Sequence, residues 1–114
     1  MAKNIKSSIL IVGSSSFLAL PVIEALKREK VYKIICQSRS SVKHNSENLN
    51  DDLIEISLDY ATSDLPKELF LNCSHVINFV NVAALSTNEI LNYRGFIGRV
   101  LGISRSTLIH ISTA

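Results

Sequence analysis

The residues best suited to chemistry lie in one short segment, where an apolar run ends in glycine and serine. Residues 9–12 are all apolar, Gly13 follows them, and Ser14, Ser15 and Ser16 precede a stretch with helical spacing. A tight turn from a buried strand into a helix aims backbone N–H groups and the positive end of the helix dipole at one point. The segment therefore predicts a binding site for a phosphate or pyrophosphate group.

A second candidate position follows the next apolar run. In dinucleotide-binding folds an acidic residue at this strand end hydrogen-bonds the adenosine ribose. Here Gln37 stands in that place and Arg39 follows two residues later. Loss of the carboxylate and gain of a guanidinium favour a 2′-phosphate, and hence NADP over NAD. The alternative interpretation is that Arg39 is a solvated loop cation.

These positions depend on the elements that hold them. Continuous or alternating apolar residues predict five strands, at residues 9–12, 31–36, 54–58, 75–82 and 107–111. Helical spacing predicts three helices, at residues 18–29, 65–71 and 87–101. Ser86 or Thr87 is expected to cap the last helix at its start, and Gly102 at its end. Alternating strands and helices predict an α/β fold, a Rossmann-like doubly wound parallel sheet in the order 3-2-1-4-5.

Length and composition restrict the class of protein. The chain has 114 residues, of which 46% are hydrophobic and 19% charged, and this predicts a single domain over residues 1–114. A net charge of +2 gives no reason to expect nucleic acid or an anionic membrane as a partner. No apolar run is long enough to span a membrane, so a cytoplasmic protein is expected. Cys36 and Cys73 are expected to be buried and free.

The turn after the first strand resembles that of the extended short-chain dehydrogenase/reductases, a family of NAD(P)-dependent epimerases and dehydratases. The family has G-x-x-G-x-x-G with an aromatic residue after the second glycine. In this sequence Gly13, Ser16 and Ala19 take the three positions, and Phe17 is the aromatic residue. The resemblance implies that Gly13, Ser15, Ser16 and Phe17 hold a dinucleotide pyrophosphate. Ser16 departs from the pattern where glycine allows close backbone approach.

Further positions match the family in the same order along the chain. Asp59 and Tyr60 resemble the pair that flanks the adenine ring. Phe79, Val80 and Asn81 resemble the strand end that passes beneath the cofactor's ribose and pyrophosphate. Val80 and Asn81 are bulkier than the small residues usual there.

Two more matches concern the active site of the family. Asn92 resembles the asparagine of an Asn-Val-x-Gly motif that ties a helix to nearby backbone. Residues 112–114 resemble the end of the family's fifth strand, so Thr113 is implied to be the catalytic hydroxyl that hydrogen-bonds the substrate. The resemblance extends from about Ile9 to Ala114, nearly the whole chain.

The family's catalytic Tyr-x-x-x-Lys pair has no counterpart in this sequence. None of its three tyrosines has a lysine four residues later. We therefore interpret the chain as the N-terminal part of a Rossmann domain, catalytically incomplete as given, whose last strand is exposed and favours a homodimer. The three histidines form no metal-ligand pattern, and neither a Walker lysine nor a G-x-S-x-G elbow is present.

Two functions remain open from the sequence. The first is the dinucleotide-binding portion of an NAD(P)-dependent oxidoreductase, epimerase or dehydratase, with a nucleotide sugar as candidate substrate. The second is a non-catalytic Rossmann module that senses a dinucleotide or mediates protein contacts. The residues Ser16, Val80 and Asn81 favour the second, because they depart from the usual cofactor contacts.

Overall fold

The computed structural model describes residues 7–14, 16, 18–39, 52–62 and 65–111. The described strands are β1 (Ser8–Val12), β2 (Lys33–Ser38), β3 (Leu53–Ser57), β4 (Cys73–Asn78) and β5 (Thr107–His110). The helical elements are α1 (Ala19–Glu29), α2 (Lys67–Phe70), the short 3₁₀ helix η2 (Val82–Ala84) and α3 (Thr87–Ser104). The strands form one parallel sheet in the order β3-β2-β1-β4-β5, which confirms the predicted Rossmann-like topology.

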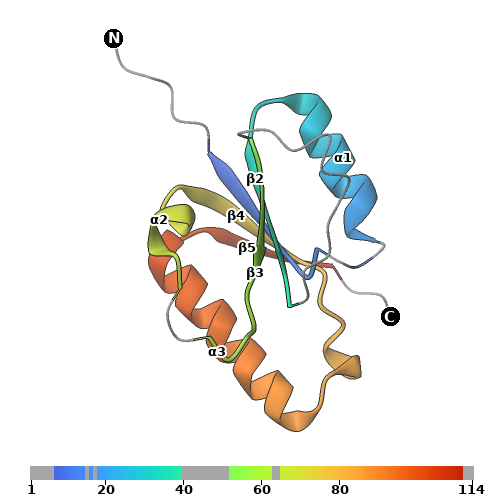
Figure 1. Ribbon diagram of the computed structural model, residues 1–114, viewed down its shortest axis with the longest axis vertical. Coiled ribbons are helices and arrows are strands. Elements are labelled where there is room, and N and C mark those ends of the chain that lie inside the picture. The colour runs from blue at the N-terminus through green and yellow to red at the C-terminus, as the bar shows by residue number, and fades with distance from the viewer. Residues whose placement is uncertain (1–6, 15, 17, 40–51, 63–64, 112–114) are drawn as a thin grey trace.

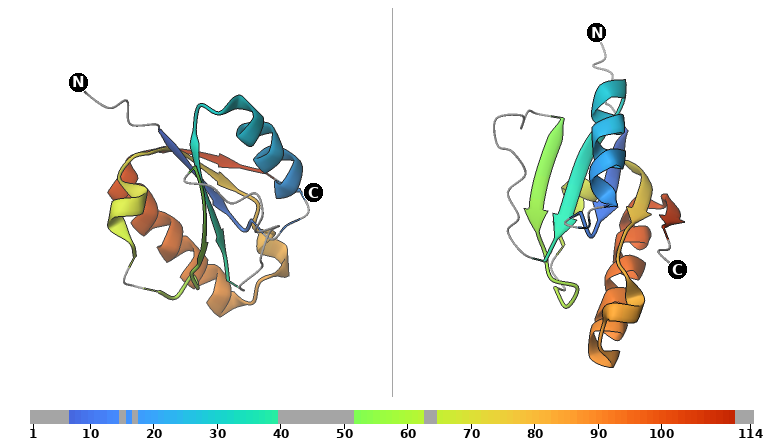
Figure 2. Two further views of the ribbon diagram at one scale, coloured as in Figure 1. Left: turned by 45° about the horizontal axis from the view of Figure 1, so that its top comes forward. Right: turned by 90° about the vertical axis from the view of Figure 1, so that its right-hand side faces the viewer.

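The sheet separates two layers of helices (Figures 1 and 2). Alternate side chains of β1 point to opposite faces, as strand geometry requires. Leu10 and Val12 are buried in the core that contains residues of α2 and α3. Ile9 and Ile11 are buried in the core under α1. The continuous apolar run at 9–12 is thus explained by a central strand that is covered on both faces.

The order of the strands reverses beside β1. From β1 the chain passes outward to β2 and β3, then returns to the other side of β1 as β4 and continues to β5. The loops that follow β1 and β4 therefore leave the sheet in opposite directions. In open α/β sheets the crevice at such a point, at the carboxyl ends of the strands, is where ligands bind.

Several strand ends differ from the predicted limits, and the structure gives a physical reason for two of these differences. β2 begins at Lys33 rather than Val31, because Lys30 ends α1 with a φ of 56° and Val31 lies at a bend, 56% exposed. β4 ends at Asn78 rather than residue 82, because the Asn78 and Asn81 side chains accept hydrogen bonds from backbone N–H groups two residues onward. Such turns compete with strand pairing.

The limits of α3 also resolve one alternative and correct one prediction. Ser86 is the N-cap: its Oγ accepts from the Glu89 N–H, and the Glu89 carboxylate accepts from the Ser86 N–H. The prediction that Gly102 ends the helix is wrong, because Gly102 lies inside α3, which continues to Ser104. Arg105 takes the capping position with a φ of 52° and donates its N–H to the Leu101 carbonyl.

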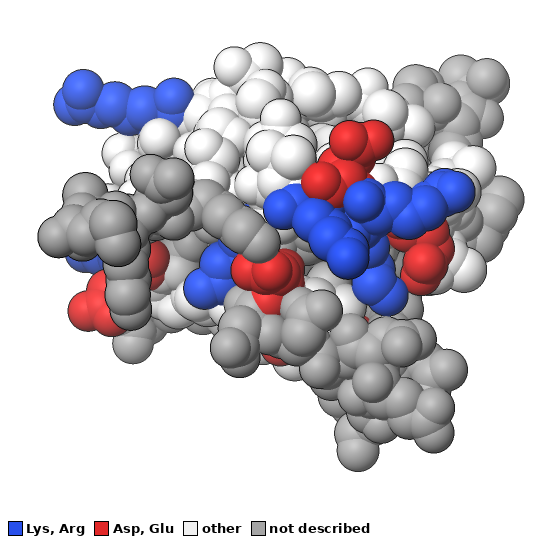
Figure 3. Space-filling model, turned by 90° about the horizontal axis from the view of Figure 1, so that it is seen from above, with Lys and Arg blue, Asp and Glu red and all other residues white. Residues whose placement is uncertain are grey.

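Charges of both signs lie side by side on the end of the molecule viewed in Figure 3. Lys27 and Arg28 occupy the last turn of α1, where the helix dipole favours positively charged side chains. Lys27 Nζ also lies 3.7 Å from Glu24 Oε1, one turn earlier.

In the part of the chain that the structure describes, no helix is both long enough and apolar enough to cross a membrane.

Candidate functional site

A cavity of about 500 Å³ lies at the carboxyl ends of the central strands. The loops after β1, β2, β3 and β4 all contribute to its wall. The lining residues are Gly13, Ser16, Ser38, Arg39, Tyr60, Phe79, Val80, Asn81, Ala84 and Leu85. Many of these residues are distant in sequence and were predicted to contact different parts of one ligand. The fold brings them together around a single cavity.

Gly13 is required at the start of this cavity by its conformation and by its neighbours. Its φ is +75°, in the left-handed region that favours glycine. A Cβ added to Gly13 would lie 3.1 Å from Val80 Cγ2 and 3.3 Å from the Val80 nitrogen. The turn after β1 therefore packs directly against the backbone that leaves β4.

Gln37 has a structural role that the sequence did not reveal. Its side chain is fully buried, although it stands where an acidic residue would contact a ribose. Gln37 Nε2 donates to the Leu58 carbonyl at 2.7 Å, and Gln37 Oε1 accepts from the Gly13 N–H at 3.0 Å. A carboxylate could accept but not donate, so an amide is the group that joins the ends of β1, β2 and β3.

The start of α1 offers fewer free N–H groups than the sequence suggested. The Ser16 N–H donates to the Gly13 carbonyl, and Ser16 Oγ accepts from the Leu18 N–H at 3.3 Å. Pro21, the third residue of α1, has no N–H to offer. Two other predicted contacts, Ser15 and Phe17, lie outside the described residues.

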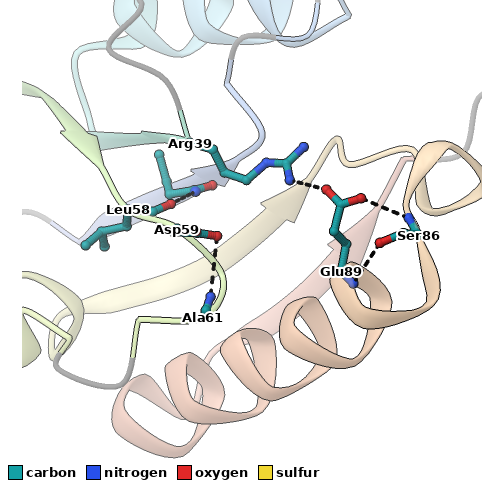
Figure 4. Close-up of polar contacts among 7 residues, drawn as sticks. Arg39, Leu58, Asp59, Ala61, Ser86 and Glu89 are labelled. Carbon is teal, nitrogen blue, oxygen red and sulfur yellow. Dashed lines mark hydrogen bonds and ion pairs between the residues drawn. The ribbon is translucent and has the colours of Figure 1, made fainter.

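Arg39 extends across the site to the first turn of α3 (Figure 4). Its Nη1 donates to Glu89 Oε2 at 2.6 Å, and this hydrogen bond raises the arginine pKa above its ordinary value. The Glu89 pKa falls to about 2, first because the Ser86 N–H donates to the carboxylate and then because Arg39 does. Both groups are therefore charged over the whole range of ordinary pH.

Tyr60 is a fixed aromatic surface in the wall of the cavity. Its ring meets the Tyr93 ring edge-on at 5.4 Å between centroids and the Phe96 ring at 5.6 Å. The Arg39 guanidinium carbon lies 5.0 Å from the Tyr60 centroid, within the range of cation–π attraction. Arg99 Nη2 donates to the Tyr60 carbonyl at 3.0 Å, which anchors the backbone as well.

Two predicted site residues, Asp59 and Asn92, do not line the cavity, and a third lies outside the part of the chain that the structure describes. Asp59 Oδ1 accepts from the Ala61 N–H at 3.5 Å, within its own turn (Figure 4). Asn92 is exposed on α3. Thr113, the predicted catalytic hydroxyl, lies outside the described residues.

Three lining residues were missed, Ser38, Ala84 and Leu85. Ser38 was detectable as the hydroxyl residue next to Arg39 at a strand end. Ala84 and Leu85 were not, because their position depends on η2, which begins at Val82, where the fourth strand was predicted to end. The signal for η2 was the pair of asparagines, Asn78 and Asn81.

The chain resembles solved structures in its fold, although its sequence matches no known family. No protein-family model matches the sequence, and no curated protein matches it. Vestitone reductase from alfalfa superposes with a TM-score of 0.69 at 17% identity, over 92% of this chain and 36% of that one. A short-chain dehydrogenase/reductase from Burkholderia vietnamiensis gives 0.64 at 15% identity, over 95% and 66% of the two chains.

A third similar structure contains a cofactor. UDP-glucuronic acid 4-epimerase from Bacillus cereus, in complex with NAD, has a TM-score of 0.66 at 18% identity over 94% of this chain and 40% of its own. The chain thus spans between 36% and 66% of the length of these three proteins. Sequence identity this low establishes shared architecture only. The chain has the Rossmann-like α/β fold of these reductase, dehydrogenase and epimerase structures.

Proposed function

We propose that this chain is the dinucleotide-binding portion of an NAD(P)-dependent oxidoreductase, epimerase or dehydratase. One observation carries the proposal: Gly13, Arg39, Tyr60 and Asn81 line one cavity beside the point where the strand order reverses. Open α/β sheets bind their ligands at this point. The volume of about 500 Å³ also falls within the range of sites for small ligands.

The lining residues fit the parts of a dinucleotide. Gly13 presents bare backbone at the turn, and the Ser16 hydroxyl and the positive end of α1 suit a pyrophosphate. Tyr60 lines the cavity and is our candidate for the adenine contact, although it is only 4% exposed and Arg39 lies over its ring. Arg39 is a guanidinium suited to a 2′-phosphate, which favours NADP.

A bound nicotinamide would supply hydride transfer, and this chain would hold and orient it. Thr113 remains the candidate hydroxyl for the reacting oxygen of a substrate. Because one structural neighbour is a UDP-glucuronic acid 4-epimerase, a nucleotide sugar is our candidate substrate. The Tyr-x-x-x-Lys pair of such enzymes would have to lie outside these 114 residues.

Calorimetric titration with NADP and with NAD tests the proposal. We expect NADP to bind in the micromolar range, and Arg39→Ala to weaken NADP by roughly tenfold while leaving NAD nearly unchanged. Arg94→Ala, which removes an exposed guanidinium of α3 outside the cavity lining, is the matched control. Failure of both nucleotides to bind would contradict the proposal.

A non-catalytic Rossmann module is the second candidate function, and three contacts within the protein favour it. The Gly13 and Ser16 N–H groups already donate within the protein, and Arg39 is already paired with Glu89. A full-length protein that binds a dinucleotide without turnover would support this alternative. Measurable oxidoreductase or epimerase activity would exclude it.

A further inference from the structure

The Arg39 guanidinium is already paired with an acidic side chain of the protein itself, that of Glu89. Arg39 follows β2 and Glu89 lies in the first turn of α3, so the ion pair joins two elements that are far apart in sequence (Figure 4). The separation of 2.6 Å is that of a strong, charge-assisted hydrogen bond. Both side chains remain partly exposed, at 44% and 41%, so an incoming ligand has access to them.

Glu89 is held in place by the start of its own helix. One carboxylate oxygen, Oε1, accepts from the Ser86 N–H at 3.0 Å, and the Glu89 N–H donates to Ser86 Oγ. The other oxygen, Oε2, is therefore the one that contacts Arg39. A carboxylate fixed in this way costs less conformational entropy to keep on Arg39 than one on a free surface side chain.

Arg39 is restrained from a second side by Tyr60, whose ring centroid lies 5.0 Å from the guanidinium carbon. A phosphate group that approaches this arginine in the cavity would therefore meet the Glu89 carboxylate at the same guanidinium. Two anions that share one cation repel each other, so the phosphate must displace the carboxylate or bind beside it at a cost. A nucleotide that carries no phosphate at this position does not meet that competition.

We propose that Glu89 determines nucleotide specificity by competing with a 2′-phosphate for Arg39. This inference rests on the proposed function of the cavity as a dinucleotide site. A nucleotide that lacks the 2′-phosphate is not expected to interact with Glu89. The carboxylate lowers the affinity for NADP and leaves that for NAD unaffected, so the preference that Arg39 gives for NADP is held below its full extent.

Glu89→Gln is the variant that isolates this effect. Glutamine serves the same position of a capping box as glutamate, so the start of α3 is retained while the charge is removed. Circular dichroism of the variant checks that retention. Glu68→Gln, which removes an exposed charge of α2 outside the cavity lining, is the control for net charge.

The full chain and each variant are titrated with NADP, NAD, 2′-AMP and 5′-AMP. We expect Glu89→Gln to tighten NADP and 2′-AMP by roughly two- to fivefold, as befits a partly exposed ion pair, and to leave NAD and 5′-AMP unchanged. Glu68→Gln should change none of the four. In an Arg39→Ala background, Glu89→Gln should no longer affect NADP, because the shared cation is gone.

The outcomes separate this inference from the function on which it rests. NADP binding that is weakened by Arg39→Ala but unaltered by Glu89→Gln would overturn the competition and preserve the dinucleotide site. An equal change in NADP and NAD affinity on Glu89→Gln would also overturn it, since the effect would not belong to the 2′-phosphate. No binding of any probe to the chain or its variants would overturn both.

Discussion

At Gly13 two independent restrictions act on one residue. The backbone has a φ of +75°, and a Cβ would approach Val80 to 3.1 Å. We predict that Gly13→Ala lowers the free energy of unfolding by about 1–3 kcal/mol, the usual cost of a strained non-glycine conformation. Urea unfolding measures the loss, and weaker dinucleotide binding should accompany it because the wall of the cavity shifts.

Gly102 is the matched control for that substitution. It lies in α3 without a positive φ, and a Cβ added there would meet nothing within 4 Å. Gly102→Ala should therefore stabilise the chain by up to about 1 kcal/mol, because alanine loses less backbone entropy in a helix. If both alanine variants shifted the urea midpoint in the same direction, the requirement for glycine at position 13 would be contradicted.

The two cysteines are free and buried, as predicted. Burial raises the pKa of Cys36 from 9.0 to about 12, with a contribution from Glu55, and that of Cys73 from 9.0 to about 11. As the pH rises, the thiols of the unfolded chain ionise before those of the folded chain. The contribution of the buried, neutral thiols to stability is therefore complete below pH 9.0 and is lost as the pH rises through the pKa values of the folded state.

We predict that neither thiol reacts quickly with a thiol-specific reagent until urea unfolds the chain. The urea midpoint should fall as the buffer is made more alkaline than pH 9.0. Cys36→Ala should reduce that fall, since one of the two thiols is removed. Rapid labelling of the folded chain would show that these side chains are accessible.

For individual residues, the sequence predicted most of the cavity wall but not the hydrogen bonds and ion pairs that those residues form. Gly13, Arg39 and Tyr60 were recognisable because each follows a strand, and parallel strands bring their ends together. The burial of Gln37 and the capture of Arg39 by Glu89 were not recognisable. Both depend on which side chain a long-range contact selects, and no local pattern encodes that choice.

Among the elements, α3 depends most clearly on its first residues. Ser86 forms the reciprocal capping box with Glu89, whereas Thr87 is the first residue inside the helix. We predict that Ser86→Ala destabilises the chain by about 1 kcal/mol, as the loss of an N-cap does. Thr87→Ala should have little effect, and thermal unfolding of the two variants distinguishes the residues that the sequence left as alternatives.

The existence of every strand and of α1, α2 and α3 was predictable, whereas η2 and the limits of several elements were not. Apolar periodicity identified β1, β4 and α3 because their buried faces repeat regularly. The end of β4 at Asn78 is decided by side-chain hydrogen bonds to the backbone, which compete with pairing only once the neighbouring strands are present. Likewise α3 continues past Gly102 because Arg105 can adopt the left-handed conformation.

For the molecule as a whole, β5 is a sheet edge with exposed apolar side chains. Leu108 is 41% and Ile109 is 39% exposed, and β5 pairs only with β4 among the described strands. We predict that this chain associates with itself in a concentration-dependent way, and that Ile109→Lys weakens the association. Sedimentation at several concentrations measures it. A wild-type chain that stays monomeric at high concentration would contradict the homodimer.

The strand order was predictable because few topologies satisfy right-handed crossovers over one sheet with helices on both faces. The shape of the cavity was not, since Ala84 and Leu85 reach its wall through η2. The sequence therefore predicted where a ligand would bind more accurately than which side chains would face it.

The central position of β1 also has a consequence for how the chain folds. β1 pairs with β2, which follows after one helix, and with β4, which follows only after β3 and α2. Contacts between distant segments form slowly, because the intervening chain must close a loop first. The most apolar strand is thus expected to remain uncovered on one edge until β4 docks. The docking of β4 would then be the step that limits the folding rate and protects the nascent sheet from aggregation.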